Sequence, residues 1–469
     1  MKKTLLLFAS AAINLAVNAQ LPYTTTQFQY DSLLNVSYGS AIDYAGNSQD
    51  LLMDIYKPVG DDNCLRPVIV LIHGGAWISG SKEDPNLVLM SRELAKKGWV
   101  VANINYRLGT HKASNYNMYA LCSTSISAPC GYICDSSEIY RANFRGMQDA
   151  KGAIRFMKDR FVIDSSDINN VFLAGESAGG FVAFAAAYTD QVSEKSADCF
   201  AISDAPVPSA NLATYGCIPV NNSLSRPDLG SIDGTLNTGM HDATVKGIGS
   251  FYGGALNLPM FQQVNDTPVV YLFHQGSDVV VNYDYGYLLG RTSWECYAQT
   301  NLCQSYYFYP LAHGGKSIDQ YFQSLGGSAP TYQADIIENY SYLNNCFSNG
   351  HSIDNLTLRL QHMTDLFAAT IDLSGNDPAT NCITNGVNDL HFIAPISLFP
   401  NPANDQLTLH LSGNKDTIPF TITDAFGKTM FNGELQGENT LIDVSHLSKG
   451  LYLLQLKDNK TPLVRWVKY

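Results

Sequence analysis

The sequence contains little charge, and what there is has an acidic excess. Only 15% of the 469 residues are Asp, Glu, Lys or Arg, and the formal net charge is −13. No cluster of Lys and Arg interrupts this balance. Because a phosphate backbone repels an acidic surface, the composition argues against a nucleic-acid partner.

Hydrophobic runs long enough to cross a membrane are also missing. At the N-terminus, Lys2 and Lys3 precede an apolar run from Leu5 to Val17, and Asn18 and Ala19 follow it. A spanning helix needs about 20 apolar residues, so we expect no transmembrane segment. A basic start, a short apolar run and small residues before a cleavage point are typical of a signal peptide, with a membrane anchor or buried helix as the alternative. Residues 1–19 are therefore expected to direct export, to the cell surface or beyond.

Cysteine, by contrast, is plentiful, with ten in the chain. In an oxidising compartment these are expected to form disulfides. The Cys130–Cys134 spacing invites a zinc interpretation, but no second cysteine or histidine pair stands at zinc-ligand spacing, so we expect no metal site. We expect a Cys296–Cys303 bridge and one within residues 122–134, and the remaining pairing stays open.

The length favours two domains. Between Leu51 and Met363, near-continuous apolar runs alternate with helical stretches, which predicts a mostly parallel sheet flanked by helices, with the site at the carboxyl edge of its strands. The expected strands are Val68–Ile72, Val100–Ile104, Val171–Ala174, Val269–Phe273 and Tyr306–Tyr309, and the helices include Asn86–Lys97 and Phe144–Lys158. Residues 108–140 and 205–245 interrupt this pattern, and we interpret them as lids or walls over the site, or as disulfide-held decoration.

The pattern changes after residue 370. A polar linker runs from Ser374 to Asn388, and from Ile396 onward short alternating strands separated by turns predict a small β-sandwich without a catalytic cluster. The expected organisation is therefore a catalytic α/β domain at residues 20–375, a linker at 376–395 and a sandwich at 396–469.

A serine between glycines stands where a strand meets a helix. Val171–Ala174 reads as a buried strand, Gly180–Ala187 as a helix, and Gly175-Glu176-Ser177-Ala178-Gly179 lies between them. A strand that turns directly into a helix crowds its own backbone, so flanking glycines are required. Such a turn is a nucleophile elbow, which exposes the serine hydroxyl at a helix N-terminus.

A serine nucleophile needs a histidine base and a carboxylate that orients it. In this fold the order is serine, acid, histidine, each on a loop after a strand. Asp278 follows the strand Val269–Phe273, with Asp284 in reserve, and His313 follows Tyr306–Tyr309. His351 is the competing histidine, but His313 is preferred because it follows a strand and sits among glycines. His274 is interpreted as a structural hydrogen-bonding residue.

Attack on a carbonyl also requires donors for the oxyanion. The loop His73-Gly74-Gly75-Ala76-Trp77 follows the strand Val68–Ile72, about 100 residues before the serine motif. Together with the N–H of Ala178, just after the nucleophile, this glycine-rich loop predicts an oxyanion hole. We therefore interpret Ser177 as a nucleophile.

With these motifs, residues 50–365 resemble α/β-hydrolase carboxylesterases that carry an HGG[GA]W loop. The resemblance is to the branch related to hormone-sensitive-lipase-like enzymes and to esterases of plant polysaccharide side groups. It implies an α/β-hydrolase fold without a cofactor, and an oxyanion hole formed by Gly75, Ala76 and Ala178. Ala76 replaces the commoner third glycine, and Gln275 is an extra residue in the usual His-Gly-x-x-Asp acid loop.

The C-terminal segment has its own resemblance. Pro400-Asn401-Pro402 and Lys449-Gly450-Leu451-Tyr452 resemble motifs of the type IX secretion sorting domains of Bacteroidota. That resemblance implies recognition by the type IX secretion machinery. A sandwich that binds carbohydrate or packs on the catalytic domain is the alternative.

The predicted function is a secreted serine carboxylesterase that acts through Ser177, His313 and Asp278. Its ester substrate could be an acyl or feruloyl group on a polysaccharide, a lipid or an aromatic polyester, and Trp77 and Glu176 are candidates for the pocket lining. The alternatives are a serine peptidase of the prolyl-oligopeptidase type and a non-catalytic adhesion protein on an esterase scaffold. No repeated blade pattern precedes the catalytic region, which disfavours the peptidase.

Overall fold

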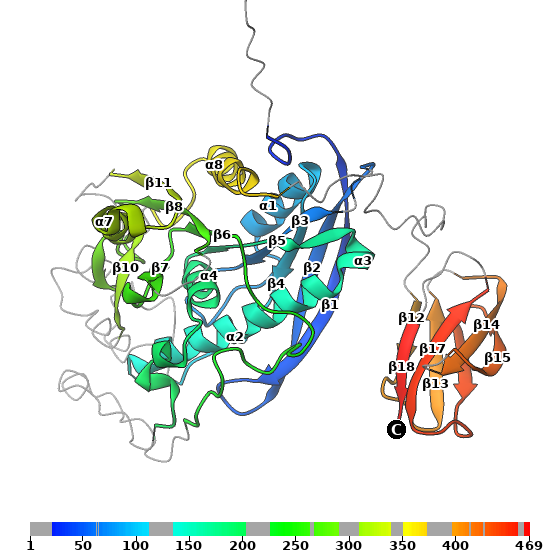
Figure 1. Ribbon diagram of the computed structural model, residues 1–469. Helices are drawn as coiled ribbons and strands as arrows, with labels where there is room; N and C mark the ends of the chain where they lie inside the picture. Colours follow the sequence, from blue (N-terminus) through cyan, green and yellow to red (C-terminus); the bar gives the residue numbers. More distant parts are fainter. Residues whose placement is uncertain are drawn as a thin grey trace, which may run out of the picture. The chain divides into compact units, whose positions relative to one another are not determined.

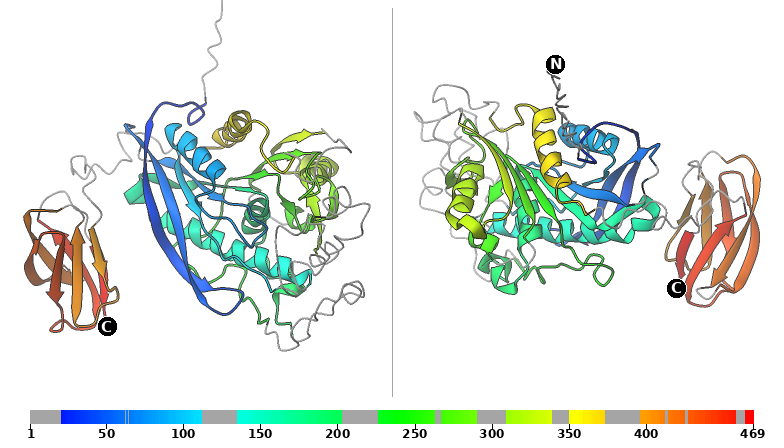
Figure 2. Two further views of the ribbon diagram at one scale, coloured as in Figure 1. Left: turned by 180° about the vertical axis from the view of Figure 1, so that it is seen from behind. Right: turned by 45° about the horizontal axis from the view of Figure 1, so that its top comes forward.

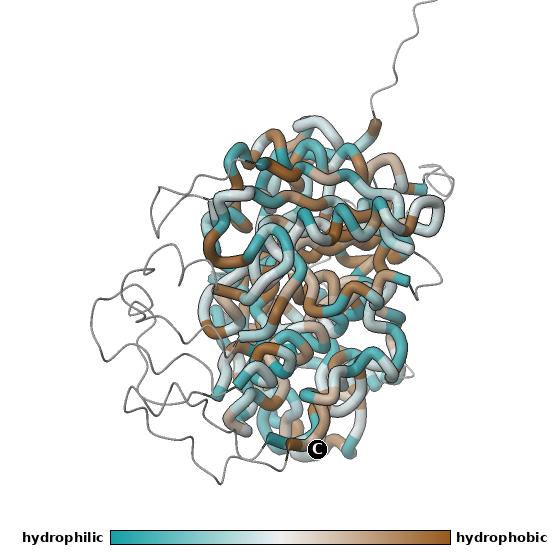
Figure 3. Tube along the Cα trace, turned by 90° about the vertical axis from the view of Figure 1, so that its left-hand side faces the viewer, coloured by the Kyte–Doolittle hydropathy of each residue, from teal (hydrophilic) through white to brown (hydrophobic). Residues whose placement is uncertain are grey.

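The chain divides into two compact units, Met1–Cys382 and Ile383–Tyr469, which are considered separately (Figure 1). The computed structural model describes residues 21–61, 63, 65–111, 135–202, 226–262, 267–289, 309–338, 350–372, 396–411, 414–424, 427–457 and 464–469. The expected signal peptide and linker lie outside these residues, as do the expected disulfides. Among the described residues, no helix combines the length and the apolar character needed to cross a membrane, and hydropathy changes over short stretches of the trace (Figure 3).

The first unit is organised around an 8-stranded sheet with the strand order β1-β2-β4-β3-β5-β6-β8-β11. Its strands are β1 (Gln29–Ile42), β2 (Ser48–Val59), β3 (Arg66–Ile72), β4 (Val100–Ile104), β5 (Ser166–Glu176), β6 (Gly247–Phe251), β8 (Val269–Gln275) and β11 (Tyr332–Ile337). β2 pairs antiparallel with β1 and β4, and the other neighbours are parallel. This mostly parallel sheet with helices is the predicted α/β-hydrolase architecture.

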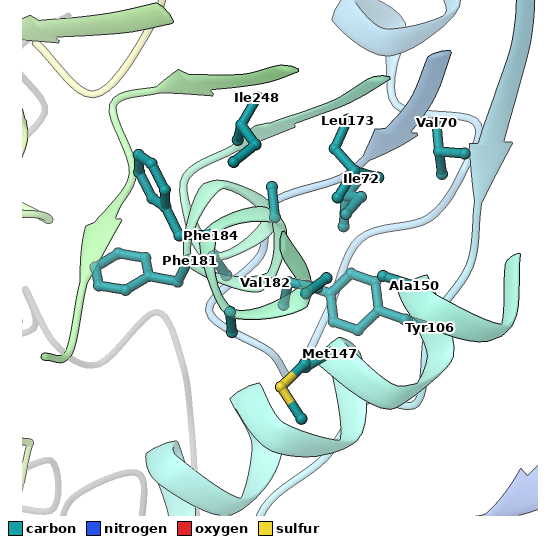
Figure 4. Close-up of a cluster of buried hydrophobic side chains, with 14 of the residues drawn as sticks. Val70, Ile72, Tyr106, Met147, Ala150, Leu173, Phe181, Val182, Phe184 and Ile248 are labelled. Carbon is teal, nitrogen blue, oxygen red and sulfur yellow. The ribbon is translucent and has the colours of Figure 1, made fainter. Parts of the chain in front are cut away.

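Helices cover both faces of the sheet, because its central strands are apolar on both sides (Figure 2). The helices are α1 (Pro85–Lys96), α2 (Ser137–Asp159), α3 (Phe161–Asp164), α4 (Ala178–Tyr188), α7 (Gly315–Leu325) and α8 (Leu356–Ala368). Val70 and Ile72 of β3 face the core formed with α2 and α4 (Figure 4). Ile69 and Leu71 face the opposite core, formed with α1 and α8. The strand alternation thus builds two separate cores.

Most predicted strands and helices in the described part of the chain are confirmed. The expected strand Tyr306–Tyr309 stays a prediction, because residues 306–308 lie outside the described residues. The segment that follows, β10 (Leu311–Gly314), pairs with β7 (Gly254–Ala255) and β9 (Tyr285–Tyr287) in a separate three-stranded sheet. The main sheet instead ends in β11. This edge strand contains Gln333 and Asp335 and is only partly buried throughout, so it forms no apolar run that would identify it.

The described part of the second insertion packs along α2. The Gln148 side-chain amide donates to the carbonyls of Leu229 and Ser231, and the Arg155 guanidinium donates to those of Asp233 and Leu236. These hydrogen bonds hold the segment of residues 226–246 alongside α2. Residues 112–134 and 203–225, where the remaining expected lid segments fall, lie outside the described residues.

The second unit is the predicted small β-sandwich. One sheet has the order β12-β13-β16 and the other β15-β14-β17-β18. The strands are β12 (Ile396–Phe399), β13 (Gln406–Leu411), β14 (Thr417–Asp424), β15 (Thr429–Gln436), β16 (Asn439–Asp443), β17 (Gly450–Leu456) and β18 (Val464–Lys468). Leu409, Ile422 and Trp466 belong to a single buried cluster, so side chains from both sheets share one core.

Candidate active site

Ser177 occupies the turn between β5 and α4, with φ 53° and ψ −120°. This backbone conformation is sparsely populated for a residue with a side chain, and such strain is typical of a site residue. The glycines around it leave no room for a Cβ: one on Gly175 would lie 2.2 Å from the Gly179 carbonyl oxygen, and one on Gly179 would lie 2.1 Å from that of Ile72. The glycines are therefore required by backbone crowding in the predicted strand–turn–helix.

A hydrogen-bonded chain of three side chains begins at this serine. His351 Nε2 lies 2.9 Å from Ser177 Oγ, and His351 Nδ1 lies 2.8 Å from Asp278 Oδ2. Ser177 is 7% exposed and Asp278 is fully buried. The serine hydroxyl can therefore pass its proton to an imidazole whose other nitrogen faces a carboxylate.

The Asp278 carboxylate is held by donors around it. Its Oδ1 accepts hydrogen bonds from the backbone N–H groups of Val280 and Val281, at 2.8 and 3.0 Å. Burial alone would raise the pKa of Asp278, but the charge of His351 and hydrogen bonds from His274 and His351 lower that pKa to about 2. The group stays anionic at neutral pH.

His351 reaches this position because it follows the last strand of the main sheet. β11 runs parallel to β8, with Ile337 opposite Gln275, so the segments after both strands leave the same sheet edge. A Cβ on Gly350 would fall 2.3 Å from the Ser277 carbonyl carbon, so a glycine before His351 permits close packing on the acid loop. The ring of Tyr252 packs edge-on against the imidazole of His351, with centroids 4.7 Å apart.

His313 is not part of this constellation, and its prediction as the base is wrong. Its Nδ1 lies 2.9 Å from Ser317 Oγ, and its ring stacks on Tyr285 at 4.4 Å. The prediction placed His313 on a loop after a strand of the main sheet, whereas His313 lies within β10 of the small sheet. Asp284, the reserve acid, accepts the Gly314 N–H through its backbone carbonyl, beside His313 rather than His351.

The predicted oxyanion loop lies against Ser177. A Cβ on Gly74 would come within 3.0 Å of Ser177 Cβ, and Gly75, Ala76 and Trp77 have positive φ values of 102°, 53° and 60°. Within the described part of the chain, the backbone N–H groups of Gly75, Ala76 and Ala178 donate to no protein acceptor. They are thus available to a ligand oxygen beside Ser177.

Two predicted pocket residues are buried instead. Trp77, 3% exposed, packs edge-on against Phe181 and donates its indole N–H to Asn143. Glu176, also 3% exposed, lies near the side chains of Tyr252 and Asn86. Trp77 belongs to the core, and strand alternation turns Glu176 away from Ser177, toward α1, so neither side chain lines the cavity beside α4. Burial, followed by the charge of Asp84, raises the pKa of Glu176 to about 8.

A cavity of about 460 Å³ lies beside α4, between α2 and the short 3₁₀ helices η2 (Val192–Glu194) and η3 (Ala197–Cys199). Apolar and aromatic side chains form part of its lining, including Tyr140, Phe144, Phe181, Ala185 and Met260. Phe181 stands one helical turn beyond Ser177. Cys199, the cysteine within the described residues, is a free buried thiol at this wall, and burial raises its pKa to about 12.

Comparisons with known proteins find a matching family in each of the two units. Residues 53–143 match the BD-FAE family, and residues 397–467 match the secretion system C-terminal sorting domain. The chain combines an esterase-type α/β-hydrolase domain with a secretion sorting domain. The first match includes the glycine-rich loop of the hydrolase domain, and the second includes nearly all strands of the sandwich.

Curated relatives of the hydrolase domain are esterases and lipases. Bile salt-activated lipase from Homo sapiens is 30% identical over 142 residues, which cover 29% of this chain and 16% of the lipase. Para-nitrobenzyl esterase from Bacillus subtilis (strain 168) is 31% identical over 156 residues, covering 32% of this chain and 27% of that esterase. The chain thus spans less than a third of the length of these relatives. Among solved structures, esterase 2 of Thermogutta terrifontis aligns over 73% of this chain and 94% of its own, with 14% identity and a TM-score of 0.39.

Proposed function

We propose that this protein is an exported serine carboxylesterase whose triad is Ser177, His351 and Asp278. The observation that carries the proposal is the chain of hydrogen bonds from Ser177 Oγ through His351 to Asp278, at 2.9 and 2.8 Å. The BD-FAE match and the esterase relatives support the same reaction class.

In the proposed reaction, Ser177 Oγ attacks the ester carbonyl carbon while its proton moves to His351 Nε2. The tetrahedral intermediate collapses, the ester C–O bond breaks, and the alcohol leaves with that proton. Water then gives a proton to His351 Nε2 as its oxygen attacks the acyl-enzyme. The carboxylic acid departs as Ser177 Oγ regains the proton, so the enzyme is unchanged. Asp278 remains a carboxylate throughout and stabilises the imidazolium.

The developing oxyanion is proposed to bind the backbone N–H groups of Gly75, Ala76 and Ala178. These donors belong to a loop packed on Ser177 and to the start of α4, and they donate to no other acceptor in the described part of the chain. Removing a single such donor typically slows catalysis by about 10²–10³-fold.

The substrate is proposed to be a carboxylic ester whose acyl group occupies the cavity beside α4. Phe181 lines the cavity and lies one helical turn after Ser177 in α4, and the aromatic part of the lining suits a bulky acyl group. Acyl or feruloyl groups on polysaccharides, lipids and aromatic polyesters are the candidate classes. The sorting domain further suggests recognition by the type IX secretion machinery and delivery to the cell surface or beyond.

Hydrolysis of p-nitrophenyl acetate, butyrate and octanoate by the full chain tests this function, with Ser177→Ala as the matched control. We expect turnover of at least one ester, and a loss of about 10³-fold or more in kcat with Ser177→Ala. Turnover of peptides but not esters would instead favour the prolyl-oligopeptidase alternative. A folded protein inert on both would favour the adhesion alternative.

A further inference from the structure

His274 stands behind the triad, outside the set that carries out the proposed chemistry. It lies near the carboxyl end of β8 and is fully buried. Its Nε2 is 3.1 Å from Asp278 Oδ2 and 3.1 Å from the Val281 carbonyl oxygen, and its Nδ1 is 2.9 Å from the Gly315 backbone nitrogen. All of these groups belong to the protein interior.

These contacts determine which nitrogen of His274 carries the proton. A backbone N–H can only donate, so Nδ1 accepts from Gly315 and is unprotonated. Both neighbours of Nε2, a carboxylate and a carbonyl, are acceptors, so Nε2 carries the hydrogen. The ring is therefore a neutral imidazole that donates to Asp278.

We propose that His274 is a positioning residue that fixes the orientation of Asp278 and, through it, of His351. Oδ2 of Asp278 receives imidazole donors from both histidines, while Oδ1 receives the N–H groups of Val280 and Val281. With donors on both oxygens, the carboxylate cannot rotate without losing hydrogen bonds in a buried site. His351 Nδ1 then keeps its proton toward Asp278, and Nε2 stays free to accept the serine proton.

The inference also explains Gly315, the second of the two glycines that follow His313. Gly315 is the first residue of α7, and its N–H is one of the donors left unpaired by the helix itself. A Cβ on Gly315 would lie 2.8 Å from His274 Cβ and 3.3 Å from His274 Nδ1. The absence of a side chain at Gly315 therefore lets its N–H reach His274. Hydrogen bonds then join α7 to the triad through Gly315, His274, Asp278 and His351 in turn.

This inference rests on the proposed function, and its test compares His274→Leu with His274→Gln in the full chain. Leucine removes the donor, whereas the glutamine amide can donate to Asp278 from about the place of Nε2. We expect His274→Leu to lower kcat for p-nitrophenyl butyrate by about 10–100-fold, as a misplaced catalytic group does, with KM changed less than about 3-fold. His274→Gln should recover most of that loss.

A second readout requires no substrate. The hydrogen-bonded Nδ1 proton of His351 should give a downfield proton NMR resonance, assigned by its loss in His351→Gln. We expect this resonance to shift or broaden in His274→Leu and to persist in His274→Gln. Should the wild-type protein hydrolyse no ester, the proposed function fails while this resonance still tests the positioning.

Wild-type kcat and an unchanged resonance in a folded His274→Leu variant would overturn the inference. Equal losses in the leucine and glutamine variants would also overturn it, because the amide donor would then be without effect. Should His274→Leu fail to fold, Gly315→Ala replaces it, since the added methyl group presses on His274. That variant should lower kcat and shift the resonance, and wild-type values for both would contradict the role.

Discussion

At residue 176, next to the nucleophile, a carboxylic acid is held out of reach of water. The motif from Gly175 to Gly179 therefore contains a hydroxyl that hydrogen-bonds His351 and, one residue before it, a buried acid. Burial and the charge of Asp84 raise the pKa of Glu176 to about 8, so the group stays protonated at neutral pH. One of its oxygens, Oε1, has no hydrogen-bond partner within the described residues. A charge there would be costly.

This acid predicts an alkaline weakening of the fold. In the unfolded chain a glutamic acid loses its proton near pH 4.5, whereas the folded protein retains it up to about pH 8. The contribution of Glu176 to stability is thus full below about pH 4.5 and is lost as pH rises to about 8, with a slope of up to about 1.4 kcal/mol per pH unit. Glu176→Gln should remove this slope, as measured by urea unfolding of both proteins between pH 5 and 9. If the free energy of unfolding changed with pH in the same way in both proteins, Glu176 would have the same pKa in the folded protein as in the unfolded chain, and the prediction would be wrong.

At the scale of elements, the central strands could be predicted from the sequence and the edge of the sheet could not. β3, β4 and β8 are buried on both faces, so apolar runs identify them. β11 lies at the edge and contains polar residues, so no apolar run marks a strand before His351, and the sequence favours His313 over it. A requirement for one more parallel strand before the catalytic histidine would have favoured His351. Ser177 and Asp278 follow central strands that apolar runs identify, and both belong to the hydrogen-bonded chain through His351.

The cavity along α4 gives an element-scale prediction. Ala185 is buried at its wall, two helical turns from Ser177, and a phenylalanine there would fill part of the space. We expect Ala185→Phe to lower kcat/KM for p-nitrophenyl octanoate by about 10-fold or more, with acetate affected much less. Chain-length profiles of the variant and of a conservative Ala185→Ser control measure this. An equal loss on every ester would mean that the acyl chain binds elsewhere.

At the scale of the whole molecule, the two units have separate cores and separate tasks. The sandwich core contains Trp466, which stacks on Tyr452 at 5.1 Å, and Asn401 of the Pro-Asn-Pro motif accepts the Val467 N–H through its side chain. Both sequence motifs that identified the sorting domain therefore contact β18. None of the residues proposed for catalysis lies in this unit.

Damage to the sorting domain should consequently leave the chemistry intact. Trp466→Ala removes a buried aromatic side chain and should cost about 3–5 kcal/mol in the unfolding of that domain. Its kcat and KM for p-nitrophenyl butyrate should equal those of the wild-type chain. Calorimetry and ester kinetics on the same preparation measure both effects, with the exposed Leu451→Ala as a control. A large loss of kcat would show that the sandwich takes part in the hydrolase site.

The central claim is that His351, and not His313, is the base that serves Ser177. The most direct measurement is kcat for p-nitrophenyl butyrate in His351→Gln and His313→Gln, each with its thermal unfolding midpoint. We expect a loss of about 10³-fold or more in the first variant and less than about 3-fold in the second, with both proteins folded. Retained activity in His351→Gln together with its loss in His313→Gln would contradict the account. The base would then be His313, in β10 of the small sheet.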